Sequence, residues 1–203
     1  MDVHMKIIGI TGGVGSGKSA LLSYIKEKYN CRVILADEVA HQVKEPGEPC
    51  YEELVRLLSP DILNEDLSIN KGSMAARIFG SKELLKKVND IIHPAVKTFI
   101  LNEIARTRAE GEKDFLFLEA ALLIEEGYLE IVDEMWYIYA GEQVRRRRLK
   151  KTRGYSDEKI DAIFRSQLKE EEFRRRCALV IDNSESLERA CRQIDERLYQ
   201  IKA

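Results

Sequence analysis

Features that mark secreted, membrane-spanning or disulfide-bonded proteins are scarce in this sequence. The chain has 4 cysteines, which are widely spaced and include no CxxC pair. That spacing argues against a disulfide framework and against a zinc site, so we expect reduced, structural thiols. No apolar run reaches the length of a membrane span, and the N-terminal segment MDVHMK lacks the apolar core of a signal peptide. We therefore expect a cytoplasmic protein that does not bind a membrane.

An excess of charge of one sign is also lacking. The chain carries 33 basic and 35 acidic residues, for a formal net charge of −2. Such a balance creates no global field that would attract nucleic acid or a membrane surface. Proline is rare, at 4 residues, and we find no Pro/Gly-rich linker, low-complexity tract or internal repeat. With 44% apolar residues among 203, the composition fits one compact, enzyme-sized domain with subdivisions.

Glycine, in contrast, is concentrated directly after the apolar run Met5 to Ile10. The segment Gly9 to Ser19 reads GITGGVGSGKS and matches the Walker A pattern of Gly12, four residues, Gly17, Lys18 and Ser19. Glycines let backbone N–H groups approach phosphate oxygens, Lys18 can reach the β- and γ-phosphates, and the Ser19 hydroxyl can bind Mg²⁺. The predicted nucleotide-binding residues are Gly13, Val14, Gly15, Ser16, Gly17, Lys18, Ser19 and Ala20.

The context of this segment favours a phosphate-binding loop over a glycine-rich turn that binds nothing. The run IIGI before it suits a buried parallel strand, and the stretch after Ser19 suits a helix. Four further strand-like runs alternate with helical segments, which indicates an α/β sheet with helices on both faces. These runs are Arg32 to Ala36, Phe115 to Leu118, Met135 to Tyr139 and Leu179 to Ile181. A long insert between the runs that end at Ala36 and begin at Phe115, roughly Ala40 to Ala109, has apolar residues at helical spacing and predicts a helical subdomain.

The absence of two motifs narrows the class of nucleotide-binding protein. A GTPase needs a DxxG and an NKxD-type element; no DxxG occurs, and Asn70-Lys71 is followed by Gly72-Ser73. A small-molecule kinase instead needs an acceptor site with a base and an arginine-bearing lid. Asp37 closes the run RVILAD, where it could act as the base; the alternative is a helix N-cap. Glu119 closes FLFLE, where it could hold Mg²⁺ through a water; the alternative is a solvated acid.

A basic segment from Glu142 to Arg153 supplies candidates for the lid arginine. It holds seven basic residues against one acidic residue. On a helix, Arg145 and Arg148 share one face while Arg146 and Arg147 point elsewhere. We therefore expect two of the four arginines to be available to phosphate, for which the planar guanidinium is well suited. The alternative, a nucleic-acid patch, is weakened by the lack of interleaved aromatic residues.

Several motifs taken in order make the chain similar, over nearly its full length, to the dephospho-CoA kinase family. TGGVGSGKS matches the phosphate-binding loop of that family, and LADEVAHQVKEPG matches its segment DAD-x-x-A-R/H-x-V-x-x-P-G. INKGSMAARIF and VNDIIHP match two elements of its substrate domain. EAALLIEEG resembles its PLL-x-E segment, and FRSQL and LVIDN follow. Each match after the first is weak alone, but their order and spacing are specific.

The resemblance implies a fold, a reaction and roles for single residues. The fold would be α/β, a P-loop NTPase three-layer sandwich with a mostly parallel sheet, a helical substrate-binding insert and a helical lid. The reaction would be transfer of the ATP γ-phosphoryl group, with Mg²⁺, to the 3′-hydroxyl of dephospho-CoA. Asp37 falls on the proposed base of the family, and Arg148 best fits its lid arginine. Lys18 would stabilise the transferring group, and Ser19 and Glu119 would serve the metal ion.

The same resemblance divides the chain into three parts. The nucleotide-binding core would comprise residues 1–39, 110–144 and 177–203, the helical CoA-binding subdomain residues 40–109, and the lid residues 145–176. We expect a monomer or weak oligomer with no nucleic-acid partner. The alternatives are a nucleoside or nucleotide monophosphate kinase, which the long insert disfavours, and a catalytically inactive nucleotide-binding regulator, against which Lys18, Ser19 and Asp37 argue.

The chain departs from the family pattern in segments that the resemblance assigns to binding of the acceptor, dephospho-CoA. Ala121 replaces the proline of PLL, Lys71 replaces an arginine, and His41 stands where many members have arginine. These changes leave the phosphate machinery intact. For His93 and Pro94, which match the HP element, the sequence does not separate a substrate contact from helix capping, and Arg77 is a weaker candidate for the substrate side.

Overall fold

The structure, a computed structural model, describes residues 5–120, 123–124 and 127–202. Ala121, one of the departures from the family pattern, lies outside the described residues. The chain forms two compact units: one combines Met1–Val33 with Gly111–Ala203, and the other is Ile34–Glu110. The second unit begins six residues before the predicted insert at residue 40. No helix in the described part of the chain is both long and apolar enough to cross a bilayer.

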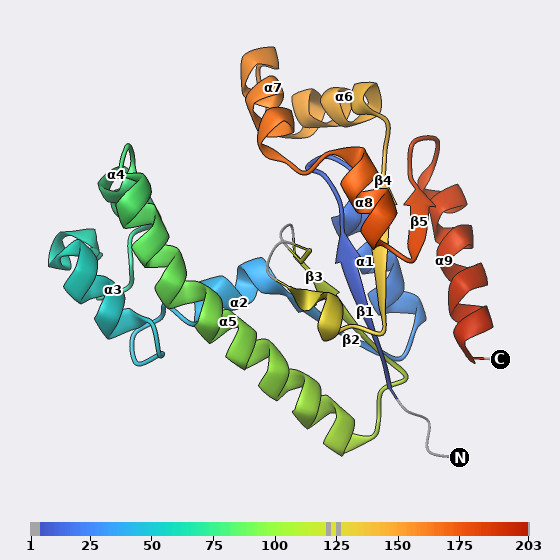
Figure 1. Cartoon of the computed structure of the whole chain (residues 1–203), viewed down its shortest axis with the longest axis horizontal. Coiled ribbons are helices and arrows are strands. Elements are labelled where there is room, and N and C mark those ends of the chain that lie inside the picture. The colour runs from blue at the N-terminus through green and yellow to red at the C-terminus, as the bar shows by residue number, and fades with distance from the viewer. Residues whose placement is uncertain (1–4, 121–122, 125–126, 203) are drawn as a thin grey trace. The chain divides into compact units, whose positions relative to one another are not determined.

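The first unit is built on a five-stranded sheet with the order β2-β3-β1-β4-β5 (Figure 1). β1 pairs with β3 and with β4, and β4 pairs with β5, each time in parallel. β1 is central and has five consecutive buried residues, as expected for a strand covered on both faces. The strands are β1 (Lys6–Thr11), β2 (Cys31–Leu35), β3 (Phe115–Glu119), β4 (Glu134–Tyr139) and β5 (Leu179–Asp182).

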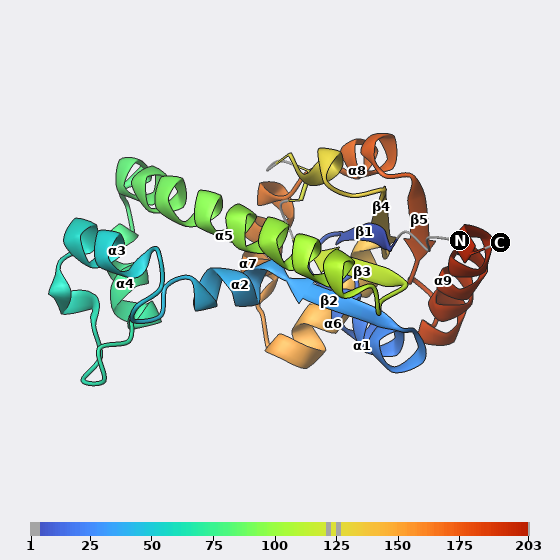
Figure 2. The same cartoon turned by 90° about the horizontal axis from the view of Figure 1, so that it is seen from below.

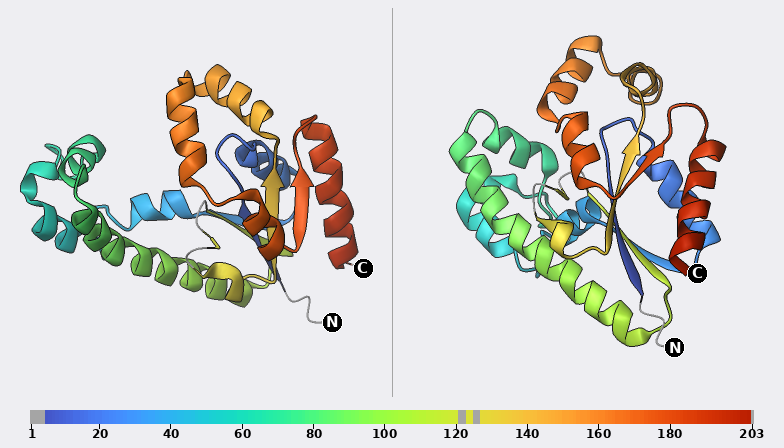
Figure 3. Two further views of the ribbon diagram at one scale, coloured as in Figure 1. Left: turned by 45° about the horizontal axis from the view of Figure 1, so that its top comes forward. Right: turned by 45° about the vertical axis from the view of Figure 1, so that its right-hand side comes forward.

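Helices cover this sheet on two sides, which confirms the predicted three-layer α/β fold. α1 (Lys18–Lys28) and α9 (Leu187–Lys202) lie together on one side, and α8 (Glu170–Arg176) lies on the other (Figure 3). On β4, Tyr137 stacks on Phe173 of α8, whereas the neighbouring residue Trp136 points to the opposite face. α6 (Glu142–Arg153) and α7 (Asp157–Ser166) follow β4 in the chain, and a short 3₁₀ turn, Tyr128–Glu130, precedes it.

One carboxylate anchors the C-terminal end of α1 to α9. Asp195 on α9 accepts hydrogen bonds from the hydroxyls of Tyr24 and Tyr29, at 2.7 and 2.5 Å, and from the Lys28 ammonium at 2.6 Å. Burial opposes the negative charge of Asp195, but the hydrogen bonds from Lys28, Tyr29 and Tyr24 outweigh it and hold its pKa below the ordinary value. Asp195 therefore stabilises the fold in its ionised form.

Replacing Asp195 by asparagine should lower the free energy of unfolding by about 1–2 kcal/mol at neutral pH, since charge-assisted hydrogen bonds are lost. Because the folded-state pKa lies below the unfolded-state value, this contribution is present above the unfolded-state pKa and disappears as the pH falls through the folded-state pKa. Urea denaturation of wild type and variant at neutral and acidic pH measures the difference. Glu196→Gln, at the exposed neighbour, is the control. A difference that persists in acid would contradict the assignment.

The second unit is helical and is organised around one long helix. α5 (Lys82–Glu110) contains 29 residues, and α2 (Ala36–Gln42), α3 (Tyr51–Leu58) and α4 (Lys71–Ile78) pack against it (Figure 2). A 3₁₀ turn, Pro60–Ile62, connects α3 towards α4. The apolar residues that face inward come from three of these elements: Leu54, Leu58, Ile62, Val88, Ile92 and Val96.

Two expectations from the sequence are corrected at the level of single residues. β2 ends at Leu35 and α2 begins at Ala36, so Asp37 lies in the first turn of α2 and does not end the strand. His93 lies in the interior of α5, which excludes its interpretation as a helix cap.

Candidate active site

The predicted phosphate-binding loop connects β1 to α1. Gly12, Gly15 and Gly17 have φ values of 149°, 83° and 94°, which side-chain-bearing residues rarely adopt. Gly17 is the N-cap of α1 and has no side chain to satisfy the first amides of the helix. Those amides therefore stay available for an anion at the N-terminus of α1, where the helix dipole also favours one.

Lys18 lies at the start of α1 and faces the carboxyl end of β3. Its ammonium donates to the carbonyl of Gly12 at 2.7 Å and lies 3.6 Å from Oε1 of Glu119. The two side chains are only 14% and 15% exposed, so their attraction is weakly screened. The structure thus brings together two residues that the sequence placed far apart, the lysine of the loop and the acid at the end of β3.

The donors near this pair suit a hard divalent cation. The Ser19 hydroxyl and the Glu119 carboxylate supply oxygen, which Mg²⁺ prefers, and Mg²⁺ usually keeps several waters and binds through one or two carboxylates plus substrate phosphates. Among the described residues no group of three or more His, Cys, Asp or Glu side chains could hold a metal by protein ligands alone.

Arg145 of α6 reaches across to the loop. Its Nε donates to the carbonyl of Val14 at 2.9 Å, and its other end donates to Oε1 of Gln167 at 2.5 Å. The guanidinium lies over the ring of Phe164, 4.3 Å from the ring centre. Burial lowers the pKa of Arg145, which nevertheless stays charged at every physiological pH. A Cβ on Gly13 would overlap this guanidinium, so the arginine would have to shift.

Arg148 contacts the loop one helical turn further along α6. Its guanidinium donates to the carbonyl of Ser16 at 3.1 Å and to that of Asn183 at 2.8 Å. The Asn183 side chain donates to the same Ser16 carbonyl at 2.8 Å and is almost fully buried after β5. Arg148 and Asn183 therefore fix the backbone of the loop from two different elements.

The other two arginines of this segment do not reach the loop. Arg146 pairs with Asp157 at 3.0 Å, with Glu142 at 3.3 Å and with Asp161 at 2.5 Å, which raises its pKa. Arg147 is exposed. The expectation that Arg145 and Arg148 share one face of a helix, with Arg146 and Arg147 elsewhere, is confirmed.

Replacing Gly17 by alanine should weaken ATP binding by about 10-fold or more. An added Cβ would overlap Asn183 and approach Arg148 at 3.4 Å, so the loop would have to move. Gly80→Ala is the matched control, since Gly80 also has a positive φ, of 82°, but no atom within 4 Å of an added Cβ. Calorimetric titration with ATP measures both variants, and equal affinities for ATP would contradict the predicted role of the loop geometry.

Two residues at this site were missed by the sequence reasoning. In the sequence, Asn183 stands out only as part of the motif LVIDN, and Gln167 only as part of FRSQL. No periodicity marks either residue, because each acts on a segment more than 20 positions away: Asn183 on Ser16, and Gln167 on Arg145. Asn183 also has a buried Oδ1 without a hydrogen-bond partner among the described residues.

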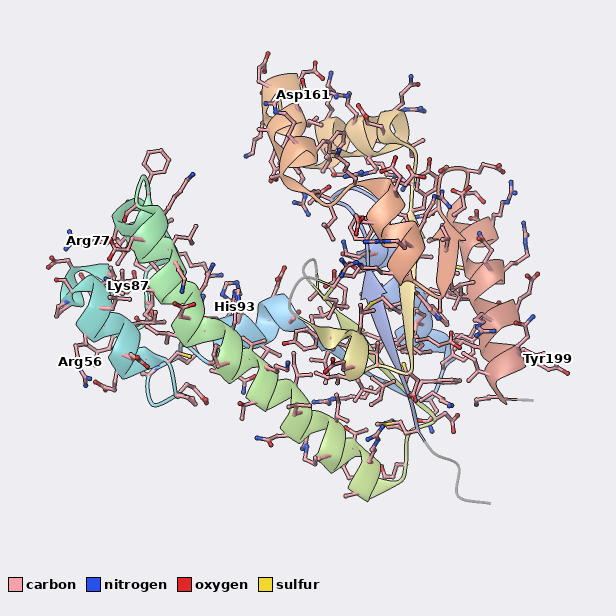
Figure 4. The ribbon with its side chains drawn as sticks, viewed as in Figure 1. Arg56, Arg77, Lys87, His93, Asp161 and Tyr199 are labelled. Carbon is pink, nitrogen blue, oxygen red and sulfur yellow. The ribbon has the colours of Figure 1, made fainter. Side chains whose placement is uncertain are left out.

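The candidate acceptor residues lie in the second unit. Asp37 is exposed in the first turn of α2, one residue after the helix begins. His93 lies on the part of α5 that runs beside α2 (Figure 4). Asp37 does not cap α2, since the N-cap of that helix is Leu35. Its carboxylate is thus exposed to a substrate, and its role as a base stays a prediction.

The loop, the parallel sheet and the arginines of α6 together define a class of protein. β1 ends in a glycine loop that leads into α1, and a lysine of that loop pairs with an acid at the end of β3. Two arginines of a following helix contact the loop backbone. This is the arrangement of a P-loop nucleotide-binding kinase.

Comparison with known proteins gives the particular family. The family model for dephospho-CoA kinase matches residues 6–189, and the chain belongs to that family. The dephospho-CoA kinase of Carboxydothermus hydrogenoformans is 35% identical over 190 residues, which cover 94% of this chain and 91% of that protein. That of Corynebacterium diphtheriae is 37% identical, with 95% and 97% covered. A solved structure of dephospho-CoA kinase from Campylobacter jejuni, 21% identical, superposes with a TM-score of 0.73 over 96% of each chain, which confirms the fold.

Proposed function

We propose that this protein transfers the γ-phosphoryl group of ATP to the 3′-hydroxyl of dephospho-CoA, the final step of coenzyme A biosynthesis. The observation that carries the proposal is the phosphate-binding loop with Lys18 held between Gly12 and Glu119, in a chain that the dephospho-CoA kinase family model matches over residues 6–189. Membership of the family identifies dephospho-CoA as the acceptor, and the loop provides the residues that bind ATP.

Three side chains and the backbone amides of the loop share the chemistry in this proposal. The hydroxyl oxygen of the acceptor attacks the γ-phosphorus, and Asp37 accepts the proton of that hydroxyl. Lys18 moves from Gly12 and Glu119 onto the phosphates and, with Arg148, stabilises the charge that spreads over the equatorial oxygens. The amides of residues 13–20 hold the phosphates in line with the acceptor.

Ser19 and Glu119 would hold a magnesium ion, Ser19 through its hydroxyl and Glu119 through a bound water. Bound there, the ion would neutralise charge on the β- and γ-phosphates. In this proposal Lys18 turns from Glu119 to the phosphates, and the Glu119 carboxylate turns to the metal-bound water.

Separate parts of the chain would bind the acceptor and close over the reaction. We assign residues 40–109 to CoA binding and residues 145–176 to a lid, which excludes water that would otherwise hydrolyse ATP. Arg145 and Arg148 tie the first helix of this lid to the loop, which supports the assignment. The protein would act in the cytoplasm as a monomer or weak oligomer.

The deciding experiment is ADP release from MgATP with and without dephospho-CoA, with AMP, CMP, shikimate and adenosine as competing acceptors. ADP that forms only with dephospho-CoA, together with a product heavier by one phosphoryl group, is the expected result. Turnover of a nucleotide acceptor would instead assign a monophosphate kinase. ATP binding without acceptor-dependent turnover would identify a regulator without catalytic activity.

A further inference from the structure

Three basic side chains of the second unit gather without an anionic partner. His41 lies on α2, Lys44 on the turn after it, and Lys71 at the start of α4. Within residues 34–110, all of which are described, none of the three side chains takes part in a hydrogen bond or ion pair. Burial, and then the charges of Lys44 and Lys71, lower the pKa of His41, and the charge of Lys71 also disfavours the charged form of Lys44.

Lys44 is the central member because its position is fixed and its side chain is half-buried. The turn that carries it is closed by hydrogen bonds from the amide of Lys44 to the His41 carbonyl, at 3.2 Å, and from the amide of Cys50 to the Val43 carbonyl, at 3.1 Å. Val43 and Cys50 are each 2% exposed, and the Cys50 thiol donates to the carbonyl of Ile91 on α5 at 3.5 Å. The base of the Lys44 side chain is therefore anchored to α5.

Such an arrangement is unfavourable for the protein alone. Burial, and then the charge of Lys71, lower the pKa of the Lys44 ammonium. Lys71 is the first residue of α4, where the helix dipole favours anions and opposes cations. Cationic groups held together at a cost to the fold are typical of a site that receives an anion.

Nearby acids offset only part of this charge. Glu45 and Asp37 both favour the charged form of His41, and Glu45 also favours that of Lys44. In the described structure neither acid comes within ion-pair distance of the Lys44 ammonium. Lys44 thus keeps a half-buried positive charge that no carboxylate of the unit neutralises directly.

We infer that His41, Lys44 and Lys71 bind the diphosphate group of the nucleotide acceptor, with Lys44 as the main contact. This inference rests on the proposed function, because it takes Asp37 as the base that meets the acceptor hydroxyl. Asp37 and His41 are four residues apart on α2, so their side chains lie on one face, about 6 Å apart. In dephospho-CoA the diphosphate is linked to the 5′ carbon of the same ribose that carries the 3′-hydroxyl. His41, a hydrogen-bond donor one helical turn from the base, and the cationic Lys44 on the turn that follows therefore fit this acceptor.

The first test uses Lys44→Met, which removes the charge and keeps most of the aliphatic stem, beside Lys44→Arg. Lys82→Met, at an exposed lysine of α5, is the matched control. Loss of one charged contact to phosphate should raise the KM for dephospho-CoA about 10- to 100-fold. The kcat and the KM for ATP should stay within about twofold of wild type, and Lys44→Arg should restore most of the loss. The variant should also melt at a higher temperature than wild type, since an unpaired charge is gone.

The outcomes separate this inference from the proposed function. If wild type itself fails to phosphorylate dephospho-CoA, the proposed function is wrong. If wild type is active and Lys44→Met has an unchanged KM for dephospho-CoA, the proposed function stands and the inference is overturned. A lower melting temperature with an unchanged KM would likewise overturn it, because Lys44 would then serve only the fold.

A second test needs no variant and distinguishes the diphosphate of the acceptor from the phosphates of ATP. Wild-type protein is acetylated briefly, and the modified lysines are quantified by mass spectrometry. Dephospho-CoA, added with a non-hydrolysable ATP analogue at saturation, should protect Lys44 and leave Lys82 reactive, whereas the analogue alone should protect Lys18 and not Lys44. Protection of Lys44 by the ATP analogue alone, or no protection by dephospho-CoA, would refute the assignment.

Discussion

Asp37→Asn should lower kcat by about 10²–10⁴-fold while ATP still binds with wild-type affinity, because general-base removal typically has this effect. Asparagine keeps the shape of the side chain and removes its ability to take a proton. Rates of acceptor-dependent ADP release and calorimetric titration with ATP provide the two measurements. The separation between them matters, since a variant that had merely lost its fold would also lose ATP binding.

Glu38→Gln is the control for this prediction. Glu38 follows Asp37 in the first turn of α2, is likewise exposed, and carries the same charge. It should keep a kcat within about twofold of wild type, since its side chain points about 100° away around the helix. A wild-type kcat for Asp37→Asn would eliminate Asp37 as the base, and equal losses in both variants would indicate a general electrostatic effect of α2.

Arg148→Met should reduce kcat by about 10³-fold or more, in the range measured for arginines that stabilise a transferring phosphoryl group. Arg148 supplies a permanent charge beside the loop, held on the carbonyls of Ser16 and Asn183 at 3.1 and 2.8 Å. Arg147→Met, at the exposed neighbour, should have no effect. Single-turnover rates with saturating MgATP and dephospho-CoA measure the chemical step directly.

Asn183→Ala separates a catalytic Arg148 from one that only supports the loop. Asn183 donates to the same Ser16 carbonyl as Arg148 but carries no charge. If Arg148 acts through charge, Asn183→Ala should weaken ATP binding and leave the chemical step much less affected than Arg148→Met does. Equal losses of the chemical step in the two variants would reduce Arg148 to a positioning residue and make Arg145 the stronger candidate.

Much of the sheet could be predicted from the sequence because its strands are apolar on both faces. The runs Phe115 to Leu118 and Leu179 to Ile181 coincide with β3 and β5 to within one residue at their ends. Helical spacing also predicted correctly which two of the four arginines of α6 share one face of the helix. In each case the pattern is local, because a buried strand, or one face of a helix, can be recognised from the apolar and polar residues of one short segment.

The contacts that complete the candidate site are not local, and the sequence reasoning did not find them. Asn183 meets Ser16 only because β5 and β1 flank β4 in one sheet. The pairing of Lys18 with Glu119 likewise follows from the β1–β3 neighbourhood. Local patterns also left two helix boundaries open: α2 starts before Asp37, and α5 extends through His93 and Pro94. The partners of a residue depend on strand order, which no short motif encodes.

The anchoring of α1 at both ends couples nucleotide binding to α9. ATP would bind at the N-terminus of α1, and Asp195 secures its C-terminus through Tyr24, Lys28 and Tyr29. A ligand that binds only the folded state adds stability that grows with the logarithm of its concentration. ATP should therefore compensate for damage at Asp195 on α9. A defect in α9 would then go unnoticed in a cell rich in ATP and emerge when energy is depleted.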